Sequence, residues 1–163
     1  MGVRSHGFEP TQKHHAPLEA VAAKHGGRLS ITKRAIGDRR GTTTFYESLD
    51  NISGSMLPEH ANVRHDATRS YEVVVVTVED AIASVPGRDI SLVKMDIEGA
   101  EYAALDATSA ETLRRVPQWI VEFHHDMLPG RTFADTRRHL RRFIELGFSV
   151  YTRDNVNFLF HAR

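Results

Sequence analysis

Short apolar segments rich in β-branched residues alternate with helical segments along most of the chain. In such an alternation each helix carries the chain back across a sheet, which favours parallel strands covered by helices. The sequence therefore predicts an α/β sandwich with a largely parallel sheet, closed by a C-terminal antiparallel hairpin. The expected strands are 3–8, 29–37, 42–46, 71–78, 90–95, 119–123, 148–152 and 156–161, and the expected helices are 11–24, 79–84, 100–105, 109–115 and 132–146.

One long segment, residues 47–70, interrupts this alternation. It contains Asn51, Gly54 and Pro58 among many polar residues and shows no sustained hydrophobic period. The pattern predicts a long loop, and loops of this length inside a compact domain are usually lids, binding loops or mobile segments. A tight turn is also expected at residues 86–87, where proline and glycine adjoin.

Composition sets limits on the function. The 163 residues are 40% hydrophobic and 26% charged, as in a single globular domain over residues 1–163 with an adequate core. Since 21 basic residues balance 21 acidic ones, nucleic acid is not expected as a partner. The absence of cysteine excludes disulfides and thiol catalysis and fits a cytoplasmic location. Apolar runs such as 73–76 are far shorter than the roughly 18 residues of a membrane span, so no membrane partner is expected.

The segment from 90 to 101 carries the clearest chemical signal. An apolar strand ends at Asp96, and Gly99 lets the chain turn into a helix whose start carries Glu98 and Glu101. In open α/β sheets ligands bind at the carboxyl ends of the strands, so Asp96 is expected to line a site. The two glutamates either share that site or simply stabilise the amino terminus of the helix through its dipole.

The same segment resembles a known family. Residues 94–101, Lys-Met-Asp-Ile-Glu-Gly-Ala-Glu, look like the signature of the FkbM family of S-adenosylmethionine-dependent methyltransferases. Further segments are similar to the family's motifs and follow in the family's order, so that the resemblance covers nearly the whole chain from Gly7 onward. These segments are 7–10, 35–38 with Gly41, 53–55, 75–80 and 121–124.

The resemblance implies a Rossmann-like methyltransferase sheet, with helices on both faces, that binds S-adenosylmethionine. Glu9 would accept hydrogen bonds from the ribose hydroxyls, because a carboxylate offers two acceptors to a vicinal diol. Ala35, Ile36 and Asp38 would lie near the adenine, and Asp96 near the methionine end. The alternative for Glu9 is a solvent-facing acid before a proline.

Glu122 and His124 are the candidate catalytic residues. They alternate on the strand 119–123 and its exit, so both point the same way. They could orient and deprotonate a hydroxyl of a small acceptor, which the resemblance suggests is a sugar or secondary metabolite. Glu98 and Glu101 are candidates for the substrate side of this site. The alternative is that residues 124–126 form a solvated turn.

No sequence motif predicts a metal site. His14, His15, His60 and His65 fall at a helix start and in the expected loop, without the spacing of metal ligands. A metal-dependent transferase that uses the Asp96 and Glu98 pair, with His124 nearby, remains an alternative. The basic set in the last helix is predicted to be a solvated face, with an anionic partner as the alternative. This set comprises Arg137, Arg138, Arg141 and Arg142.

The chain departs from the family pattern in one respect. It contains no G-x-G, and the family's opening Asp-x-Gly segment, with the first strand and helix, would lie ahead of residue 3. Residues 1–163 would then be a partial domain with a gap between strands 3–8 and 90–95, and S-adenosylmethionine binding should be weak or lost. A longer protein or a gene remnant is favoured over a partner chain that supplies the strand. A catalytically silent α/β binding module is the alternative function, and the sequence predicts no oligomeric state.

Overall fold

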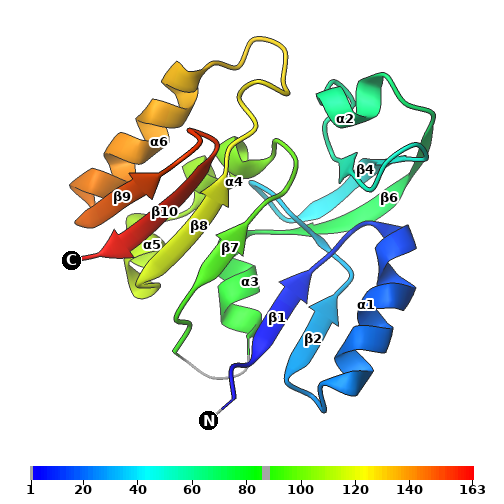
Figure 1. Ribbon diagram of the computed structural model, residues 1–163, viewed down its shortest axis with the longest axis horizontal. Coiled ribbons are helices and arrows are strands. Elements are labelled where there is room, and N and C mark those ends of the chain that lie inside the picture. Colours follow the sequence, from blue (N-terminus) through cyan, green and yellow to red (C-terminus); the bar gives the residue numbers. More distant parts are fainter. Residues whose placement is uncertain (1, 86–88) are drawn as a thin grey trace.

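The computed structural model describes residues 2–85 and 89–163, and it confirms the alternation of strands and helices (Figure 1). The expected turn at 86–87 lies outside the described residues. The strands are β1 (Ser5–Phe8), β2 (Leu29–Thr32), β3 (Ala35–Ile36), β4 (Gly41–Ser48), β5 (Gly54–Ser55), β6 (Thr68–Val76), β7 (Val93–Met95), β8 (Gln118–Glu122), β9 (Phe148–Thr152) and β10 (Asn157–Ala162). The helices are α1 (Gln12–Lys24), α2 (Ala61–Arg64), α3 (Val78–Ser84), α4 (Glu101–Ala107), α5 (Ala110–Arg115) and α6 (Phe133–Glu145).

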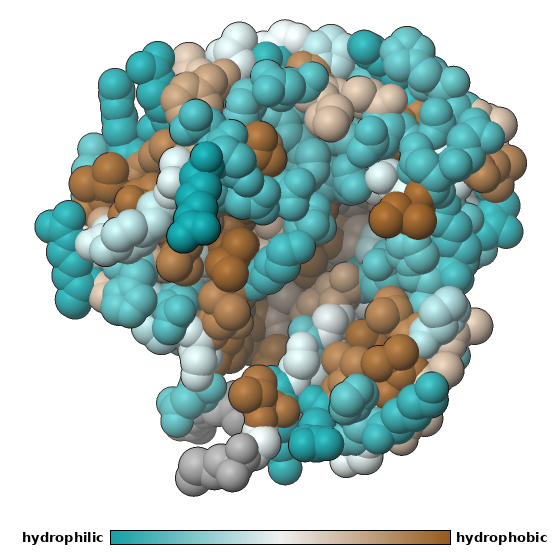
Figure 2. Space-filling view, viewed as in Figure 1, coloured by the Kyte–Doolittle hydropathy of each residue, from teal (hydrophilic) through white to brown (hydrophobic). Residues whose placement is uncertain are grey.

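The described strands form three hydrogen-bonded sheets. Their orders are β1-β2, β7-β8-β10-β9 and β3-β6-β4-β5. The pairs β1-β2, β7-β8 and β3-β6 are parallel, and β1 and β7 point in the same direction in Figure 1. Within the described residues β1 pairs only with β2 and β7 only with β8, so no strand joins these two sheets. This separation agrees with the gap expected between strands 3–8 and 90–95. In the same view, apolar surface borders a hollow near the middle of the molecule (Figure 2).

The C-terminal hairpin forms as predicted. Strand β10 pairs antiparallel with β9, and it also pairs antiparallel with β8, where Phe160 lies opposite Trp119. Between β8 and β9, strand β10 turns one face, with Phe158 and Phe160, into the core, while His161 on the other face is exposed. Phe158 and Phe160 are therefore almost completely shielded from solvent.

Two expectations about the first half of the chain are wrong. The strand expected at 29–37 is divided, because β2 pairs with β1 whereas β3 pairs with β6 in another sheet. The segment 47–70 is not one long loop: β4 and β6 pair from Gly41↔Val75 to Ser48↔Thr68, and β5 and α2 lie between them. Polar residues satisfy one another across these strands, since Tyr71 donates its hydroxyl hydrogen to the buried Glu47 carboxylate at 2.7 Å. A search for apolar periodicity does not detect strands that are stabilised by polar contacts of this kind.

The main core lies between the β7-β8-β10-β9 sheet and its helices. Trp119, Phe143 and Phe160 are fully buried, and the rings of Phe143 and Phe160 stack with centroids 3.9 Å apart. Burial of such aromatic surface is the largest favourable contribution to folding. This packing fixes β8, and with it the strand end that carries the predicted catalytic residues.

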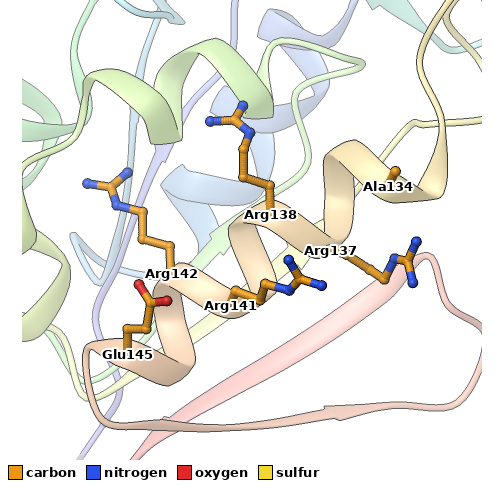
Figure 3. A pocket seen from close by; sticks show the side chains of 6 residues that line it. All are labelled: Ala134, Arg137, Arg138, Arg141, Arg142 and Glu145. Atoms are coloured by element: carbon orange, nitrogen blue, oxygen red, sulfur yellow. The ribbon is translucent and has the colours of Figure 1, made fainter.

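Helix α6 begins with a capping box and is attached to α4 by arginines. The Thr132 side chain accepts from the amide of Ala134, and the Asp135 carboxylate accepts from the Thr132 amide. Arg138 donates two hydrogen bonds of 2.8 Å to Asp106, and Arg142 donates to two carbonyl oxygens at the end of α4. The prediction of a solvated basic face is confirmed for Arg137, Arg138 and Arg141, which are exposed, and is wrong for Arg142, which is half-buried (Figure 3).

The described helices include none that is both long enough and apolar enough to cross a bilayer.

Candidate functional site

Four of the predicted site residues, Asp96, Glu98, Glu122 and His124, lie where β7 and β8 end. These strands are parallel neighbours, with Met95 opposite Val121, so their carboxyl ends lie at the same edge of the sheet. Asp96 and Glu98 follow β7, while Glu122 ends β8 and His124 lies just beyond it. The sequence prediction that these side chains share an edge is consistent with this placement. We call His60, Asp96, Glu98, Glu122 and His124 the His124 cluster.

His124 lies at the centre of the cluster and is buried. Its Nε2 atom lies 3.6 Å from Glu98 Oε2, 3.9 Å from Asp96 Oδ1 and 3.9 Å from Glu122 Oε1. The adjacent His125 is also buried, and its Nδ1 atom lies 3.3 Å from the Thr136 hydroxyl. The alternative of a solvated turn at 124–126 is therefore wrong for both histidines.

Glu101 positions His124 through the ring nitrogen Nδ1. Its Oε1 atom accepts hydrogen bonds from the amides of Ile97 and Gly99, at 3.0 and 3.2 Å, and from His124 Nδ1 at 2.9 Å. A carboxylate can only accept, so the proton on this side of the imidazole belongs to Nδ1 and Nε2 faces the cluster. Because Glu101 is fully buried, it does not face a substrate, contrary to the sequence prediction.

The turn at 97–100 gives Glu98 an unusual backbone conformation. Glu98 has a φ of 51° and Gly99 a φ of 99°, both in the left-handed region, which is uncommon for a residue other than glycine. The Ser55 hydroxyl donates to the Glu98 carbonyl oxygen at 2.7 Å and holds the turn in place. A Cβ atom on Gly99 would lie 3.3 Å from the His60 ring and 2.9 Å from Leu128, so glycine permits this close packing.

His60 is the member of the cluster that sequence reasoning missed. It caps α2, where its Nδ1 atom accepts from the Asn62 amide at 3.3 Å, and its side chain is fully buried. Its Nε2 atom lies 3.4 Å from Glu98 Oε2 and has no hydrogen-bond partner among the described residues. The available signal was its place in a segment expected to contain a binding loop. No spacing linked it to His124, which is 64 residues away in the chain.

The cluster shifts the pKa values of its members in opposite directions. Burial tends to lower the pKa of His124, but the hydrogen bond and charge of Glu101, together with Glu98 and Asp96, raise it to about 8. Burial and the charge of His124 lower the pKa of His60 to about 4. Burial raises the pKa values of Glu98 and Glu122. Such divergent shifts in one small region are typical of sites that bind or move charge.

The residues predicted to hold a cofactor lie at other strand ends. Glu9 follows β1, and its carboxylate accepts from the Thr11 amide at 2.7 Å and lies 3.2 Å from His14 Nδ1. Ala35 and Ile36 form β3, and Asp38 is exposed just after it. Among the described residues no hydrogen bond joins these groups to the His124 cluster. Asp96 belongs to the cluster itself, where Lys94 Nζ lies 2.8 Å from its Oδ2 atom.

Parallel strands whose carboxyl ends carry acidic residues agree with a Rossmann-like α/β fold of the methyltransferase type. The model of the methyltransferase FkbM domain matches residues 2–150, and the chain belongs to the FkbM methyltransferase family. No curated protein matches the chain.

A crystal structure of methyltransferase FkbM from Methylobacillus flagellatus KT is similar in fold. The TM-score is 0.58 at 15% sequence identity, and the match covers 97% of this chain. The chain spans 36% of the length of that protein.

Proposed function

We propose that this chain takes part in S-adenosylmethionine-dependent methyl transfer to a hydroxyl group of a small molecule such as a sugar or secondary metabolite. The observation that carries the proposal is the His124 cluster, in which a buried histidine faces three carboxylates at the carboxyl edge of an FkbM-family sheet. Hydroxyl methylation needs groups that orient the hydroxyl and take up its proton, and this cluster contains both kinds.

The acidic residues at the strand ends fit the cofactor chemically. Glu9 offers carboxylate oxygens to a ribose diol, and its side chain is a quarter exposed, so lone pairs remain beside its contacts with Thr11 and His14. Asp96 is a third exposed and offers a carboxylate to an ammonium group. When bound, S-adenosylmethionine supplies a methyl group on a positively charged sulfur, which passes to the acceptor oxygen as the carbon–sulfur bond breaks.

The chain's own residues handle the acceptor and its proton. Glu122, which is partly exposed, and His124 hold the hydroxyl with its oxygen directed into the cluster. Because the pKa of His124 is raised to about 8, His124 is largely protonated near neutral pH, and the hydroxyl proton passes to the Glu122 carboxylate as the oxygen–methyl bond forms. Glu101 keeps Nε2 of His124 turned toward the acceptor. Glu101 is thus a positioning residue.

Ligand-observed NMR with S-adenosylhomocysteine tests the cofactor assignment. We expect weak, saturable binding at millimolar ligand concentrations, reduced at least about five-fold in Glu9→Gln and Asp96→Asn because each loses a charged acceptor. Glu19→Gln is the matched control, since Glu19 is an exposed acid on α1 that forms an ion pair with Lys33. No saturable signal, or equal binding by all three variants, would refute the assignment.

Release of S-adenosylhomocysteine tests the reaction. S-adenosylmethionine is supplied with a panel of sugar and polyol acceptors, and Glu122→Gln and His124→Gln are compared with the unmodified chain. If product forms as fast in both variants as in the unmodified chain, these residues are excluded from catalysis.

A further inference from the structure

His60 has a buried ring nitrogen without a partner. The side chain is fully buried, and Nε2 points toward Glu98 Oε2 at 3.4 Å without forming a hydrogen bond. Buried polar atoms in native proteins almost always have a partner, so an unpartnered one aimed at a carboxylate indicates a bound group. An imidazole nitrogen and a carboxylate oxygen that face each other at this distance are a typical pair of metal ligands.

Two of the three separations between ligand atoms in the cluster match those around a single ion. Glu98 Oε2 lies 3.4 Å from His60 Nε2 and 3.6 Å from His124 Nε2, and the three atoms all lie within 4.8 Å of one another. Two ligand atoms bound about 2.1 Å from one metal at a tetrahedral angle are about 3.4 Å apart. Both separations are close to this value, whereas they are long for hydrogen bonds.

The surroundings of the three residues favour a cation. Asp96 and Glu122 add two further carboxylates near His124, and the Lys94 ammonium group is engaged by Asp96. Glu101 binds His124 Nδ1, which is the carboxylate–histidine–metal arrangement that fixes the ring and leaves Nε2 free to bind.

We infer that His60, Glu98 and His124 form a site for one divalent transition-metal ion. Two imidazole nitrogens and one carboxylate favour Zn²⁺ or Mn²⁺ over Mg²⁺, which prefers oxygen ligands. Binding requires the His60 proton to move to Nδ1, and this replaces the long 3.3 Å contact from the Asn62 amide with a metal bond at Nε2. The tautomer of His60 therefore shows whether a metal ion is bound at this site.

The role of the ion rests on the proposed function. A metal ion that binds the acceptor oxygen lowers the pKa of that hydroxyl, so its proton leaves more easily as the oxygen–methyl bond forms. Glu122, on the far side of His124 from Glu101, then receives the proton. Glu98, His60 and His124 serve as ligands, and the acceptor approaches from the side of Asp96 and Glu122, whose side chains are about a third exposed.

Zn²⁺ titration of the chelator-treated chain tests the inference. A chromophoric competitor should report one tight site per chain, and His60→Gln, Glu98→Gln and His124→Gln should each weaken it at least about ten-fold. His65→Gln and Glu59→Gln are matched controls, because both side chains are exposed neighbours of His60 in sequence. Imidazole ¹⁵N spectra should show His60 with its proton on Nδ1 only when Zn²⁺ is bound.

Several results separate the possibilities. Unchanged affinity in both His60→Gln and Glu98→Gln would place the metal elsewhere, for instance on the adjacent surface pair His14 and His15, and overturn the inference. Glu98→Gln keeps the side chain's shape, so it carries the test if thermal melting shows that His60→Gln does not fold. Tight Zn²⁺ binding without S-adenosylhomocysteine binding would refute the proposed function but support the metal site. S-adenosylhomocysteine binding without tight Zn²⁺ binding would refute the metal site.

Discussion

Replacing His139 with phenylalanine should remove a specific part of the acid sensitivity of this fold. His139 is buried in α6, where its ring stacks on Phe123 with centroids 5.8 Å apart and meets Tyr102 edge-on. Burial lowers the pKa of His139 to about 4; the nearby Arg138 and Arg142 charges act in the same direction, and Asp106 opposes them. Phenylalanine preserves the stacked ring and removes its titration.

The magnitude follows from the two protonation equilibria. In the unfolded chain a histidine titrates near pH 6.5, so between that pH and about 4 the unfolded state binds a proton that the folded state excludes. A histidine with a lowered folded pKa therefore contributes fully above pH 6.5, and its contribution is lost as the pH falls. The loss is about 2 kcal/mol at pH 5 and about 3 kcal/mol below pH 4.

Urea denaturation at pH 7 and pH 5 measures this loss. Trp119 is the single tryptophan and is fully buried in the same core, so its fluorescence reports unfolding. Between the two pH values the free energy of unfolding should fall by about 2 kcal/mol less in His139→Phe than in the unmodified chain. His25→Phe, at an exposed histidine, controls for the loss of an imidazole. Identical pH dependence in His139→Phe and the unmodified chain would refute the reasoning.

Three further substitutions test other parts of the fold by urea or thermal denaturation. Gly99→Ala should lower the free energy of unfolding by about 2 to 4 kcal/mol, because φ is 99° and the new Cβ lies 2.9 Å from Leu128. Gly130→Ala, with a φ of 76° and open space around the new Cβ, is the control and should lower it by about 1 kcal/mol. Equal losses in the two variants would contradict the reasoning. Arg142→Met should lower the free energy of unfolding by about 1 to 3 kcal/mol, because it removes two hydrogen bonds to carbonyl oxygens at the end of α4. Arg141→Met, at an exposed position, should change it by less than about 0.5 kcal/mol. Similar melting temperatures of the two variants would show that the Arg142 hydrogen bonds do not stabilise the fold. Thr132→Ala removes the cap of α6 and should cost about 1 kcal/mol, and an unchanged stability would argue against the capping box.

Local patterns predicted the elements best where one periodicity dominates. The apolar spacing in 132–146 and the glycine after it gave α6 to within a residue at each end, and the β-branched run at 71–78 marked β6. Prediction failed in 47–70, where strand pairing is stabilised by polar contacts such as Tyr71 with Glu47. Those contacts join residues 24 positions apart, so no local window contains both partners.

The sequence by itself determined the family, the alternating α/β order and the acids that follow β7, because a motif and a strand end are local properties of the chain. Only the tertiary structure decided what these residues do together. The parallel pairing of β7 with β8 brings Glu98 to His124, the buried Glu101 turns Nε2 of His124 toward the cluster, and packing against Gly99 brings in His60 from a distant segment. Ligand geometry depends on distances of a few ångströms between residues far apart in the chain, and only the folded backbone sets those distances.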